Sequence, residues 1–61
     1  AIRTESDLKK IKQIYEDPKP TETDEVLMGL LLRGVVIEYN GTRWCGIHPA
    51  VMDFLREKGE I

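Results

Sequence analysis

The stretch that decides the fold is Leu30 to Leu55, LLLRGVVIEYNGTRWCGIHPAVMDFL. It begins with the end of an apolar helix, turns at Asn40-Gly41 and continues into a new helix at His48-Pro49. Asn-Gly between two runs of β-branched and aromatic residues is the strongest short-range hairpin signal, and proline suits the first turn of a helix. The stretch therefore predicts a helix, two antiparallel strands and a final helix, in that order.

The predicted hairpin has strands at residues 35–39 and 42–47. If its turn has two residues, Ile37 faces Trp44 and Glu38 faces Arg43, and the opposite charges of the second pair support this register. The predicted core face of the hairpin consists of Val35, Ile37, Tyr39 and Trp44. The predicted outer face consists of Val36, Glu38, Arg43 and Cys45.

Two helices are expected before the hairpin. The first spans residues 3–16, begins at a cap formed by Thr4 or Ser6, and ends before Asp17-Pro18 because the residue before a proline is disfavoured in a helix. Its apolar stripe at helical spacing consists of Leu8, Ile11, Ile14 and Tyr15.

The second helix is expected over residues 21–33, with Gly34 placed to end it. Thr23 is the expected N-cap, and Thr21 with Asp24 is an alternative capping pair. The helix is short, and it leads directly into the first predicted strand.

The final helix follows His48-Pro49 and ends at Gly59. Its inward side is expected to carry Val51, Phe54 and Leu55. With 61 residues the chain forms one domain. The predicted fold class is α+β: two helices, a two-stranded antiparallel hairpin that turns at Asn40-Gly41, and a C-terminal helix.

The second helix is apolar almost all round from Val26 to Leu32, so it must be covered on more than one side. Gly29 in its middle costs up to about 1 kcal/mol relative to alanine, which close approach of another backbone would explain. The helix is either buried at the centre of the domain or covered by a second chain, which would also supplement a marginal core. The predicted partner-binding residues are Leu27, Met28, Gly29, Leu31 and Leu32.

Composition limits the classes of function. The net charge is −2, and this slight acidic excess argues against non-specific nucleic-acid binding. Cys45 is the only cysteine, and with one histidine it falls short of the four ligands of a structural zinc site. A lone thiol fits a reducing compartment, so we expect a cytoplasmic protein. No apolar run approaches the roughly 20 residues that span a bilayer, so no membrane association is expected.

Two groups of residues could suggest catalysis. Cys45 and His48 are three residues apart and could form a nucleophile and its base, but the sequence shows no third group to orient them. The acids Glu22, Asp24 and Glu25 could suggest a metal site, although acids are ordinary at the start of a helix. We therefore predict no enzyme, no cofactor, no metal and no small-molecule substrate.

The stretch from Leu30 to Leu55 resembles the C-terminal part of a winged-helix domain. A helix with a leucine-rich last turn, a glycine, a short hairpin and a helix that begins near a proline match Leu30, Leu31, Gly34, Val36, Gly41, Trp44, Pro49, Phe54 and Leu55. The resemblance implies duplex DNA binding, with the helix before the hairpin in the major groove and the hairpin near phosphates. The contacts that it implies are Arg33, Asn40, Thr42 and Arg43.

Two further groups could contact nucleic acid. Lys9, Lys10 and Lys12, together with Lys19, could form a basic strip for phosphates, or they could be the solvated side of an amphipathic helix. Tyr39 and Trp44 could form an exposed stacking platform for single-stranded bases. Aromatic residues that flank a hairpin more often belong to the core, and the core interpretation is preferred here.

Two hypotheses of function follow. The first is a small regulatory or adaptor protein that binds protein, including a second copy of itself as a homodimer. The second is a small winged-helix regulator that binds duplex DNA. The first is favoured because the helix in the recognition position carries acids at its start and offers no Arg, Lys, Asn or Gln from Val26 to Leu32 for base readout.

Overall fold

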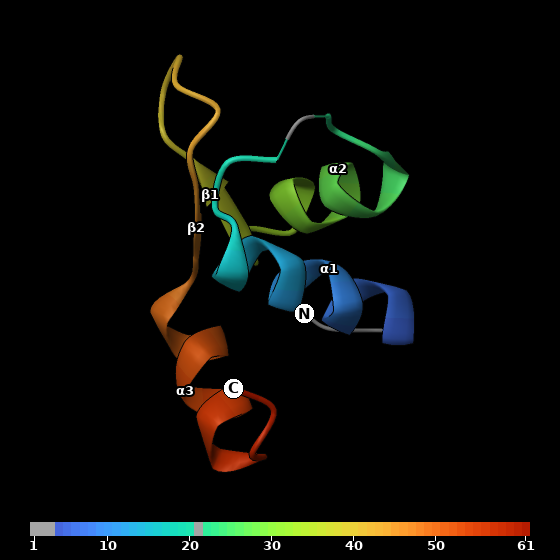
Figure 1. The fold of residues 1–61 in the computed structure, drawn as a ribbon, viewed down its shortest axis with the longest axis vertical. Coiled ribbons are helices and arrows are strands. Elements are labelled where there is room, and N and C mark those ends of the chain that lie inside the picture. Colours follow the sequence, from blue (N-terminus) through green and yellow to red (C-terminus); the bar gives the residue numbers. More distant parts are fainter. Residues whose placement is uncertain (1–3, 21) are drawn as a thin grey trace.

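A computed structural model describes residues 4–20 and 22–61 of the chain. In chain order its elements are α1 (Glu5–Glu16), α2 (Glu25–Leu32), β1 (Val36–Glu38), β2 (Cys45–Ile47) and α3 (Pro49–Glu57). The two strands form one antiparallel sheet, and α1 and α2 lie beside it while α3 extends from the end of β2 (Figure 1). The predicted α+β layout and order of elements are confirmed. Within the described residues, none of the helices combines the length and apolar character needed to cross a membrane.

The N-terminal ends of the helices are set by side-chain caps. Thr4, one of the two predicted candidates, caps α1, and its hydroxyl accepts a hydrogen bond from the Asp7 amide at 3.1 Å. Asp24, not Thr23, caps α2 by accepting from the Leu27 amide at 2.8 Å. The prediction of Thr23 was wrong because the Asp24 carboxylate also binds the Lys10 ammonium at 2.7 Å, which favours the later start. Positions 3 and 21, where the helices were expected to begin, lie outside the described residues.

The turn from α2 into β1 depends on Gly34, which has a φ of +76°. The Val35 amide donates to the Leu30 carbonyl at 3.0 Å and the Gly34 amide donates to the Leu31 carbonyl at 3.2 Å. This is the Schellman arrangement, which satisfies the last carbonyls of a helix when a residue in the left-handed region follows it. Val35 and Leu30 are both buried beside it, so the helix end and the strand start pack as one unit.

The same arrangement ends α3. Gly59 has a φ of +72°, and the Glu60 amide donates to the Leu55 carbonyl at 2.9 Å. The last residue, Ile61, then folds back and packs against the core. The predicted glycine stops at both helix ends are confirmed.

The register of the hairpin differs from the prediction by two residues. Val36 pairs with Ile47, Ile37 with Gly46 and Glu38 with Cys45. The Asn40-Gly41 turn is present, since the Thr42 amide donates to the Tyr39 carbonyl at 3.0 Å. Gly41 has a positive φ of 72° but Asn40 does not, so the turn is not type I′, which needs a positive φ at both central residues.

The chain therefore needs a longer loop before it can return. Thr42 and Arg43 join the loop, and Arg43 takes a φ of +66°, which is uncommon for a residue other than glycine. The first cross-strand bond beyond the ladder joins the Tyr39 amide to the Trp44 carbonyl at 2.8 Å. Glu38 faces Cys45 instead of Arg43, and the residues that the structure describes hold no Glu38–Arg43 ion pair, contrary to prediction.

The hairpin turns the opposite face to the core from the one predicted. A slip of two residues leaves each side chain on its face, but the face that carries Val36 and Cys45 is buried. On the other face Ile37, Tyr39 and Trp44 are 46%, 58% and 48% exposed. The placement of these three residues in the core was wrong because the Schellman turn at Gly34 aims Val36 inward as the first residue of the strand.

The core lies between α1, α2, the inner face of the hairpin and the last helix. Its fully buried side chains of largest volume are Ile11, Leu27, Leu30, Val36 and Leu55. Tyr15 and Phe54, which were expected to point inward, are about half exposed. The linker between α1 and α2 also contributes, because the Pro18 carbonyl accepts from the Cys45 amide at 2.8 Å and so lies along the outer edge of β2.

Candidate functional site

The outer side of α2 is the first candidate site. Leu32 is 81% exposed and Met28, one turn earlier, is 49% exposed. Residues four apart lie on the same side of a helix, so these two side chains form one apolar strip. Leu31 borders the strip and packs partly against the core. Leu27 is only 1% exposed, so the prediction that it contacts a partner is wrong: it faces the protein's own core.

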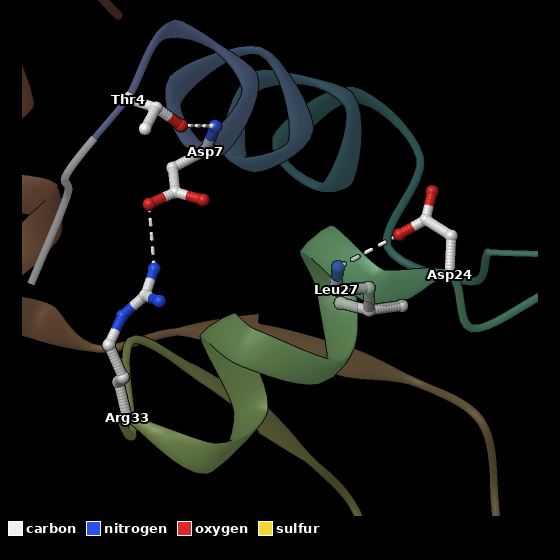
Figure 2. A network of polar contacts seen from close by, with 5 residues as sticks. All are labelled: Thr4, Asp7, Asp24, Leu27 and Arg33. Carbon is white, nitrogen blue, oxygen red and sulfur yellow. Dashed lines mark hydrogen bonds and ion pairs between the residues drawn. The ribbon is translucent and has the colours of Figure 1, made fainter.

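Gly29 is explained within the chain. A Cβ at this position would lie 3.3 Å from the Arg33 guanidinium and would meet no backbone of another element. No backbone of another element of the described chain lies close to Gly29, so the approach of a second chain stays a prediction. The space beside Gly29 is used by the Arg33 side chain, which reaches from the end of α2 to α1 and contacts the Asp7 carboxylate at 2.7 Å (Figure 2). Asp7 is the one charged residue among the described residues that is buried.

The predicted basic residues do not form an open strip. Lys10 pairs with Asp24 at 2.7 Å, Lys12 lies 3.7 Å from Glu60, and Arg33 is committed to Asp7. Lys9 is exposed and has no carboxylate partner among the described residues. The chain's own carboxylates thus pair with three of the cations that were expected to face phosphates, Lys10, Lys12 and Arg33.

The second candidate site is the exposed face of the hairpin, which carries Ile37, Tyr39 and Trp44 and is called the outer face from here on. Tyr39 and Trp44 are directly opposite each other, as the bond between their backbones shows. The Tyr39 ring lies over Gly46, with its hydroxyl oxygen 3.0 Å from where a Cβ of Gly46 would be. The Lys19 ammonium lies over the Trp44 ring, 5.7 Å from its centroid. The face is therefore aromatic, flat at its glycine, and bordered by a cation.

The tip of the hairpin combines structural and exposed polar groups. The Thr42 hydroxyl donates to the Tyr39 carbonyl at 2.9 Å and accepts from the Trp44 amide at 3.2 Å. This side chain holds the loop in shape, while Asn40 and Arg43 are exposed beside it. Of the three hairpin residues implied by the winged-helix resemblance, Asn40 and Arg43 thus have exposed side chains that make no hydrogen bond or ion pair with the described residues.

Cys45 is buried in the hairpin, and His48 caps a helix. Burial, followed by the charge of Glu38, raises the pKa of the Cys45 thiol above its usual value of 9.0, which keeps the thiol protonated at neutral pH. Its sulfur lies 3.7 Å from the Arg43 carbonyl oxygen. The His48 Nδ1 accepts from the Ala50 amide at 3.1 Å and caps α3. Each of these two residues thus has a structural role, and the Cys45 thiol is not activated as a nucleophile.

The carboxylates at the start of α2 also have a structural role. A side-chain hydrogen bond from Lys10, and next the backbone bond from Leu27, hold the pKa of Asp24 below its usual value of 3.8. Within residues 4–20 and 22–61, no group of three or more histidine, cysteine, aspartate and glutamate side chains is placed to hold a metal ion.

The lowered pKa of Asp24 predicts a specific dependence of stability on pH. Because the folded protein binds this proton less readily than the unfolded chain, Asp24 stabilises the fold above its usual pKa of 3.8, and the contribution is lost as pH falls through the lower folded value. We expect Asp24→Asn to lose less stability than the wild type when urea unfolding is measured from about pH 6 to about pH 2. Lys10→Met should likewise reduce the change in the free energy of unfolding over this pH range. Parallel curves for all three proteins would contradict a contribution of the Lys10–Asp24 contact to the lowered pKa of Asp24.

Two clefts lie away from these surfaces. One, of about 430 Å³, lies beside the end of α1 and the linker and includes Lys10, Glu16, Asp17 and Glu22 among its lining residues. The other, of about 230 Å³, has an apolar lining that consists of Ile14, Tyr15, Pro18, Cys45, Ile47 and Met52. Neither is lined by the exposed residues of α2 or of the outer hairpin face.

No protein-family model, curated protein or solved structure matches the chain. The resemblance to winged-helix domains therefore stays a prediction.

Proposed function

We propose that the chain is a small non-enzymatic regulatory or adaptor protein that acts by binding protein, and that it self-associates through the outer side of α2. The observation that carries this proposal is the exposure of Leu32, 81%, next to the half-exposed Met28. Scattered exposed apolar residues are normal on a surface. Two long apolar side chains on one side of an eight-residue helix form a continuous strip, which is typical of an interaction surface.

A homodimer would use this strip efficiently. In a two-fold interface the same patch lies on both subunits, so Met28 of one copy can pack against Leu32 of the other. Fully burying a side chain of this kind contributes roughly 1.5–3 kcal/mol. The small size of the chain, 61 residues, favours such a supplement to its core.

Duplex DNA is the less favoured alternative. Binding to a duplex depends mainly on cations that neutralise phosphates. Lys10, Lys12 and Arg33 already contact carboxylates of the same chain, and the net charge is −2. Contact with phosphates would require these ion pairs to be exchanged, which reduces the gain from each contact.

Sedimentation equilibrium over a range of concentrations tests self-association. We expect the wild type to dimerise and Leu32→Glu to remain a folded monomer, because a carboxylate in the strip would have to lose its hydration on association. Phe54→Glu is the matched control, since Phe54 is similarly large, apolar and 48% exposed but lies on α3. It should dimerise like the wild type.

Two results would contradict the proposal. One is a wild type that stays monomeric at millimolar concentration. The other is equal loss of dimer in both variants while circular dichroism shows both folded. Titration with a duplex at two salt concentrations separates the alternative, because binding through phosphates weakens steeply as salt rises.

A further inference from the structure

We propose that the face of the hairpin that carries Tyr39 and Trp44, with the Lys19 ammonium over the Trp44 ring and the exposed Arg43 next to Trp44 in sequence, is a binding site for single-stranded nucleic acid. This surface is separate from the strip on α2, so the proposal goes beyond the self-association proposed above. It rests on the shape of the aromatic face and on the charges next to it.

The aromatic pair is presented to solvent by the backbone. Tyr39 and Trp44 lie opposite each other just beyond the ends of β1 and β2, with the Tyr39 amide 2.8 Å from the Trp44 carbonyl oxygen. Side chains directly opposite in an antiparallel ribbon point to the same side. Both are about half exposed, and the buried side chains Val36 and Cys45 lie on the other face. The pair is therefore available to a ligand without any rearrangement of the core.

The face is flat. Gly46 has no side chain, and the Tyr39 ring occupies the space above it, with the hydroxyl oxygen 3.0 Å from the position of a Cβ. Neither of the two clefts described above includes Ile37, Tyr39 or Trp44 in its lining. A protein partner typically anchors a side chain in a pocket, whereas a nucleobase stacks on the flat face of an aromatic ring. The shape thus favours unpaired bases.

The charges next to the pair suit a phosphate backbone. Lys10, Lys12, Arg33 and Arg56 all have carboxylate partners in the chain. Among the described residues, Lys9, Lys19, Arg43 and Lys58 have none, and of these Lys19 and Arg43 lie nearest to the aromatic pair in the structure or the sequence. The Lys19 ammonium is instead placed over the Trp44 ring at 5.7 Å, and Arg43 immediately precedes that ring in sequence. Lys19 therefore borders the aromatic pair, and Arg43 is exposed next to Trp44 along the loop.

The tip adds a polar group that could contact a base. The loop is held by Thr42, whose hydroxyl bonds to backbone on both sides, and Asn40 is exposed at its turn. An asparagine amide both donates and accepts hydrogen bonds. Stacking at the ring pair and hydrogen bonding at the tip can thus act on neighbouring nucleotides, while a duplex would keep its base faces stacked and inaccessible.

Trp44 is the only tryptophan in the chain, so its fluorescence reports directly on the proposed site. The probes are an oligothymidylate of fifteen nucleotides and a mixed-sequence strand of the same length. Each is compared with the duplex that it forms with its complementary strand. We expect single strands to quench Trp44 saturably, and duplexes to quench it much less. With two cations the logarithm of affinity should fall with the logarithm of salt at a slope of about −1.4, and Arg43→Ala should reduce this slope to about −0.7.

A matched pair of variants isolates the site. Tyr39→Ala should weaken binding by roughly 5- to 150-fold, the range that one lost stacking contact produces. Phe54→Ala is the control, because Phe54 is as exposed as Trp44 and also has a lysine, Lys58, 5.7 Å from its ring centroid, but it lies on α3. Its affinity should equal that of the wild type.

Several results would overturn the proposal. They are the absence of saturable quenching at low salt, equal or tighter binding of duplex, an affinity that does not change with salt, or equal losses in Tyr39→Ala and Phe54→Ala. Circular dichroism of each variant confirms that it is folded. Because Leu32→Glu leaves the hairpin intact, it should bind the strands normally, so failure of self-association and failure of this site are distinguishable.

Discussion

Leu30→Ala should lower the free energy of unfolding by about 2–5 kcal/mol, the range for removing a fully buried leucine. Leu30 has no exposed surface and its carbonyl accepts the bond that closes the turn into β1. A domain of 61 residues is expected to have a total stability of roughly 3–9 kcal/mol. We therefore expect Leu30→Ala to remove a large fraction of the total stability, as measured by urea unfolding followed by circular dichroism.

Leu32→Ala is the matched control on the same helix. It makes the same chemical change two residues later, at a side chain that is 81% exposed. Substitutions at such surface positions usually change stability by no more than about 0.5 kcal/mol. At concentrations where the protein is monomeric, similar losses in the two variants would show that the assignment of inner and outer sides of α2 is incorrect.

Arg33→Met should destabilise the fold by about 2 kcal/mol, since hydrogen bonds to charged groups contribute about 1.5–3 kcal/mol. The guanidinium contacts the Asp7 carboxylate at 2.7 Å, and Asp7 is only 7% exposed. Methionine keeps most of the apolar stem but removes the charge, which leaves a buried carboxylate without this partner. The contact joins α1 to α2 across 26 positions of sequence, so we expect the loss to appear in the global unfolding transition.

A double-mutant cycle with Asp7→Asn separates the pair from other effects. The double variant should be more stable than the sum of the two single losses predicts, because the second substitution removes the charge that the first left buried. Arg56→Met is the control: Arg56 lies 3.8 Å from Asp53, and both side chains are more than half exposed. Such surface pairs contribute about 0–1 kcal/mol. Additive losses for Asp7 and Arg33 would contradict a direct contribution from their contact.

The ends of the elements could be predicted from local chemistry. Pro18 ends α1, glycines at 34 and 59 end the other two helices, and Pro49 begins α3. Each effect depends on the backbone of one or two residues and is therefore visible in the sequence. The cap of α2 was misplaced by one residue because the choice between Thr23 and Asp24 was decided by Lys10, which belongs to another helix.

The buried face of the hairpin could not be predicted because both faces carry apolar residues, and the charges of Glu38 and Arg43 made the face of Val36 and Cys45 look like the outer one. Alternation with a period of two assigns Val36 and Cys45 to one face and Ile37 and Trp44 to the other, but it does not say which face is buried. The larger aromatic side chains favoured the wrong choice. Gly46, opposite Ile37, could have indicated the exposed face. A glycine contributes no side chain to a core, and here it leaves room for the Tyr39 ring to lie on the surface.

For the candidate surfaces, too, the sequence does not show which side is buried. A helix that is apolar all round contains no information about which side is buried, so Leu27 was grouped with Met28 although its side chain faces the core. The ion pair between Asp7 and Arg33 depends on how α1 and α2 are placed, which no local pattern of sequence describes. The tertiary arrangement was needed for both.

The proline-flanked linker beside β2 limits how far the sheet can grow. It satisfies the Cys45 amide through the Pro18 carbonyl, but Pro18 and Pro20 have no N–H to offer to another strand. On the opposite edge Val36 is already covered by its own chain. An incoming strand would thus find few groups to pair with beside β2, and beside β1 only the end at Glu38 is exposed.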